Sequence, residues 1–569
     1  MRITTKVIQN NSLRNINTNK LLQDKLSQQM STEKKVNRPS DDPIVAIRSL
    51  RLRTNVNQIT QYYDKNAKDA DSWLEVTEGA LESMNDVITD MYDKCVKGNN
   101  EDITLEDRKI ILTALEELRN EVYATGNSDY AGRYVFTGYR TDTPLTFLED
   151  TKEKYNITEQ LDATKIDSVT YVETGDILEI NGTNFSKNDA QGNPVAIGNE
   201  REVEDTEVHR IRLAYKDLFY DEGAPADPTD DQGVPKIQIW NPNRQMTDAQ
   251  GRPMIDAQGQ PVIEAGYDDA EKVITGLTYE VASIYDANNP YSTINQRGNE
   301  NKVIMVKETG ELLLGSAVYE KLVNIKDDPT TSANEGEIRI NYDKEDWKER
   351  DLMPEHYFAC TTEKPAPTDQ DPDATRTVFY NADYLLGISD EDKQVIEYDV
   401  GLNQAIRVNT TADEVFHHAI GRDVEDLINS MEESIKMEEQ VGKLKKMLEE
   451  NTDPDNVEIM EQNLAAAEKA LVYVREKTQK LFEGGITKMQ EHLDVLNFAV
   501  TENGTRGQKL ELVTNRLMSQ KTNFETLKSE NEDIDLTDVA IRLSSAELTY
   551  SAALMSTGKV MQNTLMNFI

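Results

Sequence analysis

The sequence has little of what most catalytic and metal-binding sites are built from. Its 569 residues include five histidines, two cysteines and three tryptophans. Two cysteines cannot build a four-cysteine zinc site, and Cys95 and Cys360 are expected to be free thiols, because nothing in the sequence brings them together. His-Glu-x-x-His, Gly-x-Ser-x-Gly and phosphate-binding glycine-rich loops are absent. We therefore expect no enzyme activity, no cofactor and no metal site.

Basic residues and long apolar runs are also scarce. The chain has 62 Lys and Arg against 104 Asp and Glu, a net charge of −42, which argues against binding nucleic acid or anionic lipid. No apolar run approaches the roughly 20 residues that a membrane-spanning helix needs. The polar sequence after Met1 lacks the apolar segment of a signal peptide, so export would use another route.

One short stretch is dense in residues that end and start helices. It reads Asn37-Arg38-Pro39-Ser40-Asp41-Asp42-Pro43. Because the residue before a proline disfavours helix, a preceding helix should end by Arg38. If Asp42 caps the next helix, Pro43 falls at its first position, where a missing N–H costs nothing. On local chemistry alone, the stretch is an ordinary corner between two helices.

The segment before this corner predicts a polar helix that is marginal on its own. Leu22, Leu26 and Met30 form a narrow apolar stripe at spacing four, which buries little surface. Residues 1–60 contain eleven basic and four acidic side chains, whereas residues 531–569 contain five acidic and two basic ones. The opposite charges favour pairing of the two chain ends, although each exposed pair contributes little.

A long heptad pattern follows Pro43 and predicts a coiled-coil-like helix. It should stop at Gly98, and a second helix should follow from Leu105 to Val122 and end at Gly126. The two seams of the first helix run Val56, Tyr63, Ala70, Thr77, Met84, Met91 and Leu52, Ile59, Asn66, Trp73, Ala80, Val87.

The middle of the chain, from about 128 to 410, changes to short β-rich runs separated by Gly, Pro, Asn and Asp. The expected strands include residues 169–172, 177–180, 237–240, 303–306, 338–340, 395–398 and 406–408. A repeat of the form Asp-Ala-Gln-Gly-x-Pro at residues 189–194, 248–253 and 256–261 predicts hairpin turns. A calcium loop is the alternative, but the alternating acidic ligands of an EF-hand are missing.

Helical periodicity returns near residue 412, breaks at 451–454 and continues to about residue 500. Another helix is expected after Gly504, and a last one from Asp535. The fold is therefore predicted as α+β, with both chain ends forming a helical coiled-coil rod around a β-rich insert. The expected divisions are an inner helix 1–42 paired with 532–569, rod segments 43–140 and 411–531, and a surface-exposed insert 141–410, which can hold two subdomains.

Several stretches at both ends resemble the bacterial flagellin superfamily. The most specific is 37–43. The others are Gly132-Arg133-Tyr134-Val135-Phe136-Thr137-Gly138, Gly504-Thr505-Arg506 with Leu510-Glu511, Ile534-Asp535-Leu536-Thr537-Asp538-Val539-Ala540 and the ending Thr564-Leu565-Met566-Asn567-Phe568-Ile569. The resemblance covers about residues 1–147 and 395–569. The middle is much larger than in short family members, and 436–485 is expanded.

The resemblance implies a structural role outside the cell, at the junction between flagellar hook and filament. It implies type III export without a cleaved signal peptide. The implied partners are hook-associated protein 1, flagellin, further copies of the chain in a ring, and an export chaperone at the C-terminal region. The implied assembly or hinge residues are Asn37, Arg38, Pro39, Ser40, Asp41, Asp42, Pro43, Gly504 and Arg506. The implied terminal coiled coil contains Leu22, Leu26, Met30, Leu536, Val539, Leu543, Tyr550 and Leu565.

Three alternatives stay open from the sequence. The chain could be a filament-forming flagellin, although the Arg-Pro-Ser-Asp-Asp-Pro form of the corner argues against this. The insert could bind glycan or a host surface, because it is expected to face solvent and contains aromatic residues. The insert could also carry a hydrolase, which the missing metal motif disfavours.

Overall fold

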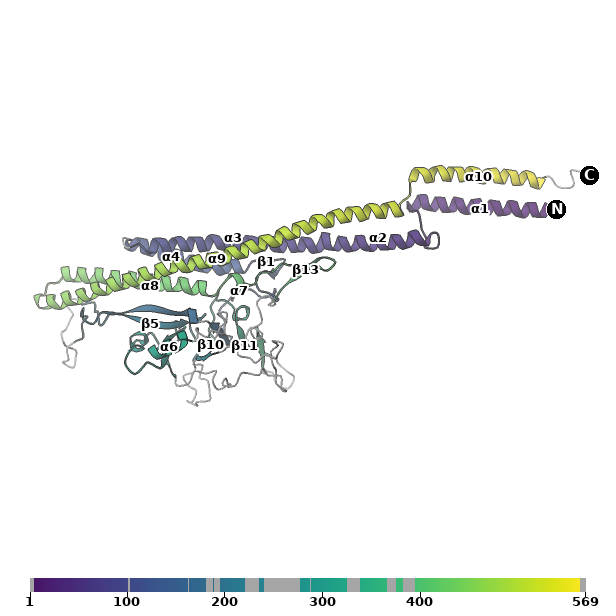
Figure 1. The fold of residues 1–569 in the computed structure, drawn as a ribbon. Coiled ribbons are helices and arrows are strands. Elements are labelled where there is room, and N and C mark those ends of the chain that lie inside the picture. The colour runs from purple at the N-terminus through teal and green to yellow at the C-terminus, as the bar shows by residue number, and fades with distance from the viewer. Residues whose placement is uncertain are drawn as a thin grey trace, which may run out of the picture. The chain divides into compact units, whose positions relative to one another are not determined.

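The computed structural model confirms an α+β fold, with helices from both chain ends and strands from the middle of the chain (Figure 1). By Cα proximity the chain divides into two compact units. The terminal unit is Met1–Ser72, Glu397–Arg407 and Thr505–Ile569, and the central unit is Trp73–Ile396 and Val408–Gly504. The structure describes residues 5–100, 103–161, 163–180, 188, 195–220, 235–239, 277–286, 288–324, 338–365, 375–381 and 394–562.

In the terminal unit, the first and last helices pair as predicted. Helix α1 (Thr5–Thr32) packs along α10 (Leu536–Gln562), and both chain ends lie at the same end of this pair (Figure 1). Leu26 is buried against Val539 and Ala546.

The predicted stripe along this helix pair is covered only in part. Leu543 packs against the same small core, and Tyr550 is half-buried. In contrast, Leu22, Met30 and Leu536 remain 49%, 41% and 47% exposed. The narrow stripe therefore buries little surface, as the sequence predicts. Two helices side by side cover only one narrow seam of each other.

The long helix after the corner is confirmed, with one irregularity. Helix α2 (Pro43–Gln61) continues through a π-helical turn (Tyr62–Asn66) into α3 (Ala67–Gly98). Along the first seam, Val56, Ala70, Thr77, Met84 and Met91 are buried as expected.

The second seam is displaced by one residue after the π-turn. Trp73 and Ala80 are still buried, but Val87 is only half-buried. The buried residues at this seam are Ala67, Leu74, Leu81, Ile88 and Cys95. The half-buried Asn66 instead donates from Nδ2 to the Asp399 carbonyl at 2.7 Å.

The central unit contains helices α4 (Leu105–Gly126), α7 (Ala412–Val415) and α8 (Ala419–Glu449), and the first part of α9 (Val457–Glu532). Thr104 and Asp107 form a capping box at the start of α4. The predicted break at 451–454 is confirmed, but the predicted break at Gly504 is wrong, because α9 runs without interruption for 76 residues. A glycine inside a helix costs only about 1 kcal/mol relative to alanine, so packing can carry the helix through it.

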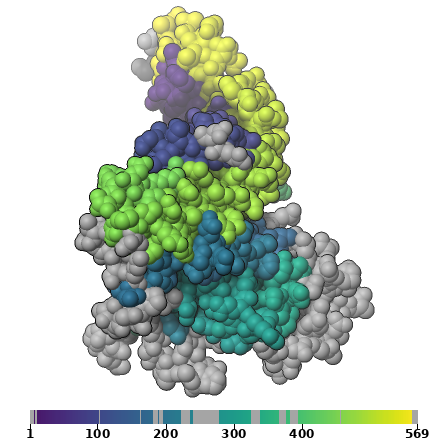
Figure 2. All heavy atoms as spheres, turned by 90° about the vertical axis from the view of Figure 1, so that its left-hand side faces the viewer, coloured from purple at the N-terminus to yellow at the C-terminus, as the bar shows by residue number. Residues whose placement is uncertain are grey.

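Two five-stranded sheets lie in the central unit, in the orders β12-β11-β3-β10-β6 and β4-β5-β9-β8-β7. Every pair in them is antiparallel except β7 with β8. Figure 2 shows helix α8 in green above the teal strand-rich segment. The strands are β3 (Tyr155–Leu161), β4 (Ile166–Glu173), β5 (Glu204–Arg212), β6 (Lys236–Ile239), β7 (Thr278–Ala282), β8 (Lys302–Val306), β9 (Glu311–Leu314), β10 (Ile338–Lys344), β11 (Ala359–Pro365) and β12 (Thr375–Tyr380).

Smaller elements complete the described chain. The hairpin β1 (Asp129–Tyr130) with β2 (Arg133–Tyr134) follows α4 in the central unit, and β13 (Glu397–Gly401) with β14 (Gln404–Arg407) lies in the terminal unit. Three short helices lie between strands: a 3-10 turn (Ala163–Lys165), α5 (Pro290–Thr293) and α6 (Ser316–Asn324). Two further 3-10 turns are Pro354–His356 and Pro454–Asn456.

One predicted strand is wrong, and some predictions lie outside the described residues. Residues 177–180 form no strand, because the side chain of Asn463 on α9 takes the place of a neighbouring strand. Its Oδ1 accepts from Leu178 N at 3.1 Å, and its Nδ2 donates to Leu178 O at 2.6 Å. The three Asp-Ala-Gln-Gly turns and residues 564–569, including Leu565, lie outside the described residues. Cys95 and Cys360 are both free and buried, as expected.

Candidate functional site

The corner at 37–43 has the local geometry that the sequence predicts. Asp42 is the N-cap of α2, and its Oδ1 accepts from Ile44 N and Val45 N, both at 3.1 Å. Pro43 occupies the first helical position. A turn precedes the cap, in which Asp41 N donates to Arg38 O at 2.9 Å and Asp41 Oδ2 accepts from Arg38 N at 3.2 Å. Residues 37–41 are exposed, so the hydrogen bonds of this turn hold the corner itself.

The chain ends are joined beside the corner by a short backbone bridge. Lys34 pairs with Asp533 in an isolated antiparallel bridge. Lys35 N donates to Glu532 O at 2.7 Å, and Ile534 N donates to Glu33 O at 3.2 Å. Glu33 has a φ of 55°, a left-handed conformation that is uncommon for a residue with a side chain. The backbone therefore turns sharply where α1 ends, directly opposite the entry into α10.

A buried carboxylate lies at the centre of this bridge. Glu532 is 4% exposed and accepts from Arg53 Nε at 2.7 Å and from the terminal Arg53 nitrogen at 2.8 Å. Ser49 Oγ donates to the same carboxylate, and Lys34 Nζ lies 3.8 Å from it. Lys34 also pairs with Asp533. We call Lys34, Ser49, Arg53, Glu532 and Asp533 the clasp.

The clasp holds its two acidic residues in the charged state. The hydrogen bond from Arg53 is the largest cause that lowers the pKa of Glu532, and burial opposes it. The hydrogen bond from Lys34 is the main cause that lowers the pKa of Asp533. Two parallel hydrogen bonds between a guanidinium and a carboxylate also fix direction. The arrangement can therefore fix the angle at which the chain passes between the terminal helices and α2.

Sequence reasoning placed the joint at 37–43 and missed the clasp. A basic segment and an acidic segment at the two ends were visible, but not which of many charges would meet. The missed residues share one feature, which is that each lies within about three helical turns of a predicted helix end. The other predicted hinge residues lie elsewhere: Gly504 is inside α9, and Arg506 is 8% exposed on the same helix.

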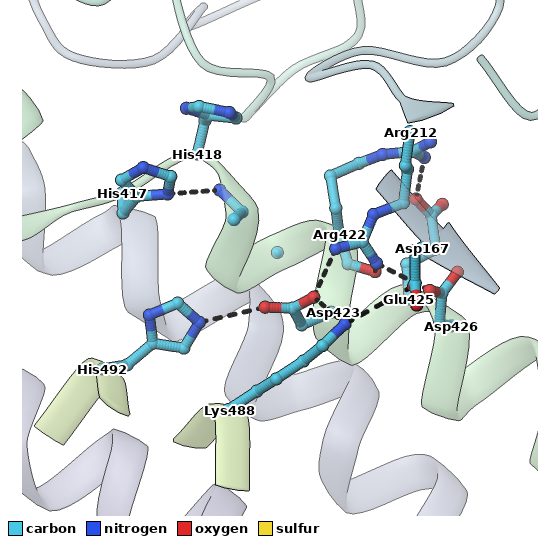
Figure 3. A network of polar contacts seen from close by, with 12 residues as sticks. Asp167, Arg212, His417, His418, Arg422, Asp423, Glu425, Asp426, Lys488 and His492 are labelled. Carbon is cyan, nitrogen blue, oxygen red and sulfur yellow. Dashed lines mark hydrogen bonds and ion pairs between the residues drawn. The ribbon is translucent and has the colours of Figure 1, made fainter. Parts of the chain in front are cut away.

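A second group of polar contacts holds α8 in the central unit (Figure 3). Asp423 accepts from Lys488 Nζ at 3.0 Å, lies 3.0 Å from His492 Nε2 and pairs with Arg212. Asp426 accepts from Arg210 and Arg212, both at 2.6 Å. Strand β5, helix α8 and helix α9 thus meet at two carboxylates of α8.

These carboxylates are kept charged in spite of burial. Burial alone raises the pKa of Asp423, but the hydrogen bond from His492 and the charges of Arg212 and Lys488 lower it well below its usual range. For Asp426, burial is likewise outweighed by the charges of Arg210 and Arg212, which lower its pKa. The network therefore joins the sheet to the helices, and its acidic and basic side chains are paired with one another.

The histidines near this network do not form a metal centre. The rings of His417 and His418 stack with centroids 4.4 Å apart, and His417 Nδ1 accepts from Ala419 N at 3.2 Å. Burial is the main cause that lowers the pKa of His417 to about 4. Within the described ranges, no cluster of three or more His, Cys, Asp or Glu side chains is arranged to hold a metal ion. Across those same ranges, no helix combines the length and the apolar character that crossing a bilayer requires.

Comparison with known proteins finds similarity in the N-terminal part of the chain. Residues 3–141 match the family described as the bacterial flagellin N-terminal helical region. The chain is 32% identical over 182 residues to flagellar hook-associated protein 3 of Escherichia coli (strain K12), which is 31% of this chain and 56% of that protein. It is 29% identical over 128 residues to a flagellin of Clostridium tyrobutyricum, which is 22% of this chain and 34% of that protein.

The chain therefore spans about half the length of the first of these relatives, and about a third of the second. Among solved structures, FlgL of Xanthomonas campestris aligns over 83% of this chain and 98% of its own, with 11% identity and a TM-score of 0.26. A TM-score of that size carries no argument about this chain.

Proposed function

We infer that this protein is a structural subunit of the bacterial flagellum at the junction between hook and filament. The match of residues 3–141 to the flagellin N-terminal helical region supports this role. A relative that aligns over 182 residues of this chain has the name of a hook-associated protein. The role is structural and not enzymatic. It places the protein outside the cell, after export by the flagellar type III apparatus without a cleaved signal peptide.

The observation that carries this proposal is the apolar surface of the paired terminal helices. On α10, Ile541, Leu548 and Met555 are 65%, 74% and 71% exposed, and their spacing of seven puts them on one face. On α1, Leu21 is 70% exposed. Apolar side chains gathered on one face of a helix mark an interaction surface. This face supports burial of the helix pair in an assembly.

The proposed partners follow from that role. Further copies of the chain would complete a ring, with hook-associated protein 1 on one side and flagellin on the other. An export chaperone would cover the C-terminal region before assembly. In this proposal, 1–42 and 532–569 form the inner layer, 43–140 and 411–531 the rod, and 141–410 the outer insert. The corner at 37–43 transmits the angle between inner layer and rod.

The test is deletion of the gene in the bacterium that encodes the protein, followed by electron microscopy of the flagella. Loss of filaments with hooks intact, restored by the wild-type gene, is the expected result. Normal filaments in the deletion strain would overturn the junction role.

A filament-forming flagellin is the second candidate, because one relative carries that name. Purified protein added to flagellin seeds separates the two. A junction protein stops after a limited layer, whereas a flagellin extends the filament without limit.

A further inference from the structure

One groove in the central unit has the shape and chemistry of a ligand site that the junction role does not use. It has a volume of about 790 Å³, within the range of roughly 300–1,000 Å³ that is typical of small-ligand pockets. Its walls come from strand β4, residues 284, 285, 289 and 291, the β8–β9 turn at 308–311 and helix α8. We call it the tyrosine groove.

Three tyrosines line this groove. Tyr171 and Tyr291 are half-buried and stack with ring centroids 5.5 Å apart and an angle of 13° between the rings. They pack against the core of the second sheet, beside Val169 and Ile304, so their positions are fixed. Tyr285 is 83% exposed and makes no contribution to that core. An exposed aromatic ring beside a fixed aromatic pair offers flat apolar surfaces to a ligand.

Each basic side chain of the groove is paired with an acidic one, and Glu308 accepts hydrogen bonds from Ser283 Oγ and Ile284 N. Arg210 holds Asp426 at 2.6 Å and also Glu311. On the helix side, Lys477 holds Glu433 at 2.6 Å, and Lys216 holds Glu425 at 2.6 Å. Figure 3 shows Arg422, Glu425 and Asp426 gathered at the same end of α8. A charged ligand would have to separate one of these pairs, which is costly where the charges are buried.

Hydrogen-bonding capacity remains among the neutral side chains. Asn429 is exposed on α8, and Asn289 is half-buried on the opposite wall. Carboxylates that are held in an ion pair keep further lone pairs for hydroxyl donors. A polar, uncharged ligand with apolar faces fits these walls better than an ion or a hydrocarbon.

We propose that the tyrosine groove binds a neutral carbohydrate. Sugar hydroxyls would pair with Asn289, Asn429 and the outer oxygens of Glu433, and the C–H face of a sugar ring would lie on Tyr285. The groove lies within the central unit, between strands of the insert and helices α8 and α9, and none of its lining residues belongs to the terminal helices. The protein would therefore add glycan recognition at the flagellar surface to its structural role.

The experiment uses the full chain on a printed array of neutral, sialylated and sulfated oligosaccharides, followed by calorimetric titration of the neutral glycan that is retained best. The test variant is Tyr285→Ala. The matched control is Phe379→Ala, which removes another exposed aromatic ring, 70% exposed on β12, that does not line the groove. Both positions are on the surface, so circular dichroism should show all three proteins equally folded.

The wild type and Phe379→Ala should bind a neutral glycan equally, and Tyr285→Ala should bind it about tenfold more weakly. Asn429→Ala should give a smaller loss. Retention of only charged glycans, no retention of any neutral glycan, or equal binding by Tyr285→Ala and wild type would each overturn the proposal. Filament assembly should be normal in Tyr285→Ala, which separates this site from the junction role.

Discussion

Arg53 and Glu532 are 479 residues apart in the chain and form a bidentate ion pair, with N–O distances of 2.7 and 2.8 Å. The carboxylate is buried and the guanidinium is half-exposed. This pair lies beside the bridge through which both terminal helices connect to the rest of the terminal unit. Its strength therefore bears on whether the helix pair keeps a fixed direction.

Replacing Arg53 by Met should loosen this joint. Glu532 would remain buried with only Ser49 and the more distant Lys34, at an expected cost of about 1.5–3 kcal/mol for a hydrogen-bonded charge. Hydrogen exchange of the amides in 530–536 should accelerate accordingly. Arg51→Met, two residues earlier and exposed, is the control and should leave exchange unchanged. Equal acceleration in both variants would show that the pair does not hold the joint.

The corner can be tested apart from the clasp. Asp42→Ala removes the acceptor of two backbone N–H groups and should destabilise the start of α2 by about 1 kcal/mol.

Replacing Pro39 and Pro43 together by Ala should leave the rod folded but impair assembly, because the corner loses its fixed backbone angles. Ser40→Ala, at an exposed position of the same turn, is the control. Normal filaments from the double proline variant would reduce 37–43 to an ordinary corner.

Some of the fold could be predicted because its causes are local. The Asp42 cap, the helix end at Gly98 and the break at 451–454 depend on neighbouring residues, and the structure confirms each of them. The pairing of α1 with α10 followed from the helical patterns at both chain ends and from their opposite charges. The sequence did not say how far each apolar stripe would be covered, because coverage depends on what else packs there.

The remaining features depend on contacts that are distant in sequence. With 104 acidic residues in the chain, nothing local marks Glu532 as the one that Arg53 and Ser49 meet. The burial of Leu74 and Ile88, one position after the second seam, cannot be anticipated from a strict heptad pattern. Residues 177–180 are apolar and β-branched enough to look like a strand, but Asn463 satisfies their backbone from a helix. Gly504 looked like a helix boundary, and tertiary packing overrode it.

The continuity of α9 at Gly504 can be measured directly. A Cβ at this position would meet nothing within 4 Å, so Gly504→Ala should stabilise the helix by about 0.5–1 kcal/mol in urea unfolding. At Gly485, a Cβ would lie 3.1 Å from Leu427 Cδ2, so Gly485→Ala is the control and should show no such gain. Destabilisation by Gly504→Ala would indicate that the chain needs glycine there for a non-helical conformation.

Acid sensitivity should depend on buried His356. It is 7% exposed, and its Nε2 donates to Pro144 O across 2.9 Å. Burial is the main cause that lowers its pKa from 6.5 to about 4. Between these values the unfolded chain takes up a proton and the folded chain does not, so stability falls as the pH drops from 6.5 to 4, by about 3 kcal/mol in all.

His356→Gln keeps a donor for Pro144 and cannot titrate. Urea unfolding of both proteins between pH 7 and pH 4 should show a smaller loss of stability in the variant. Carboxylates titrate in both proteins alike, so the difference between the two curves isolates His356. Parallel curves would show that this histidine takes up its proton in the folded state as readily as in the unfolded one.

The exposed face of α10 gives the most direct test of assembly. Leu548 is 74% exposed, so Leu548→Asp should leave the folding of the subunit unchanged. If the face defined by Ile541, Leu548 and Met555 is buried between subunits, the new carboxylate must be desolvated without a partner, which is strongly unfavourable. The variant should be secreted but should not restore filaments in the deletion strain. Thr549→Asp adds the same charge at the next exposed position, about 100° around the helix, and should restore them. Filaments with Leu548→Asp but none with Thr549→Asp would place the contact on another face of α10.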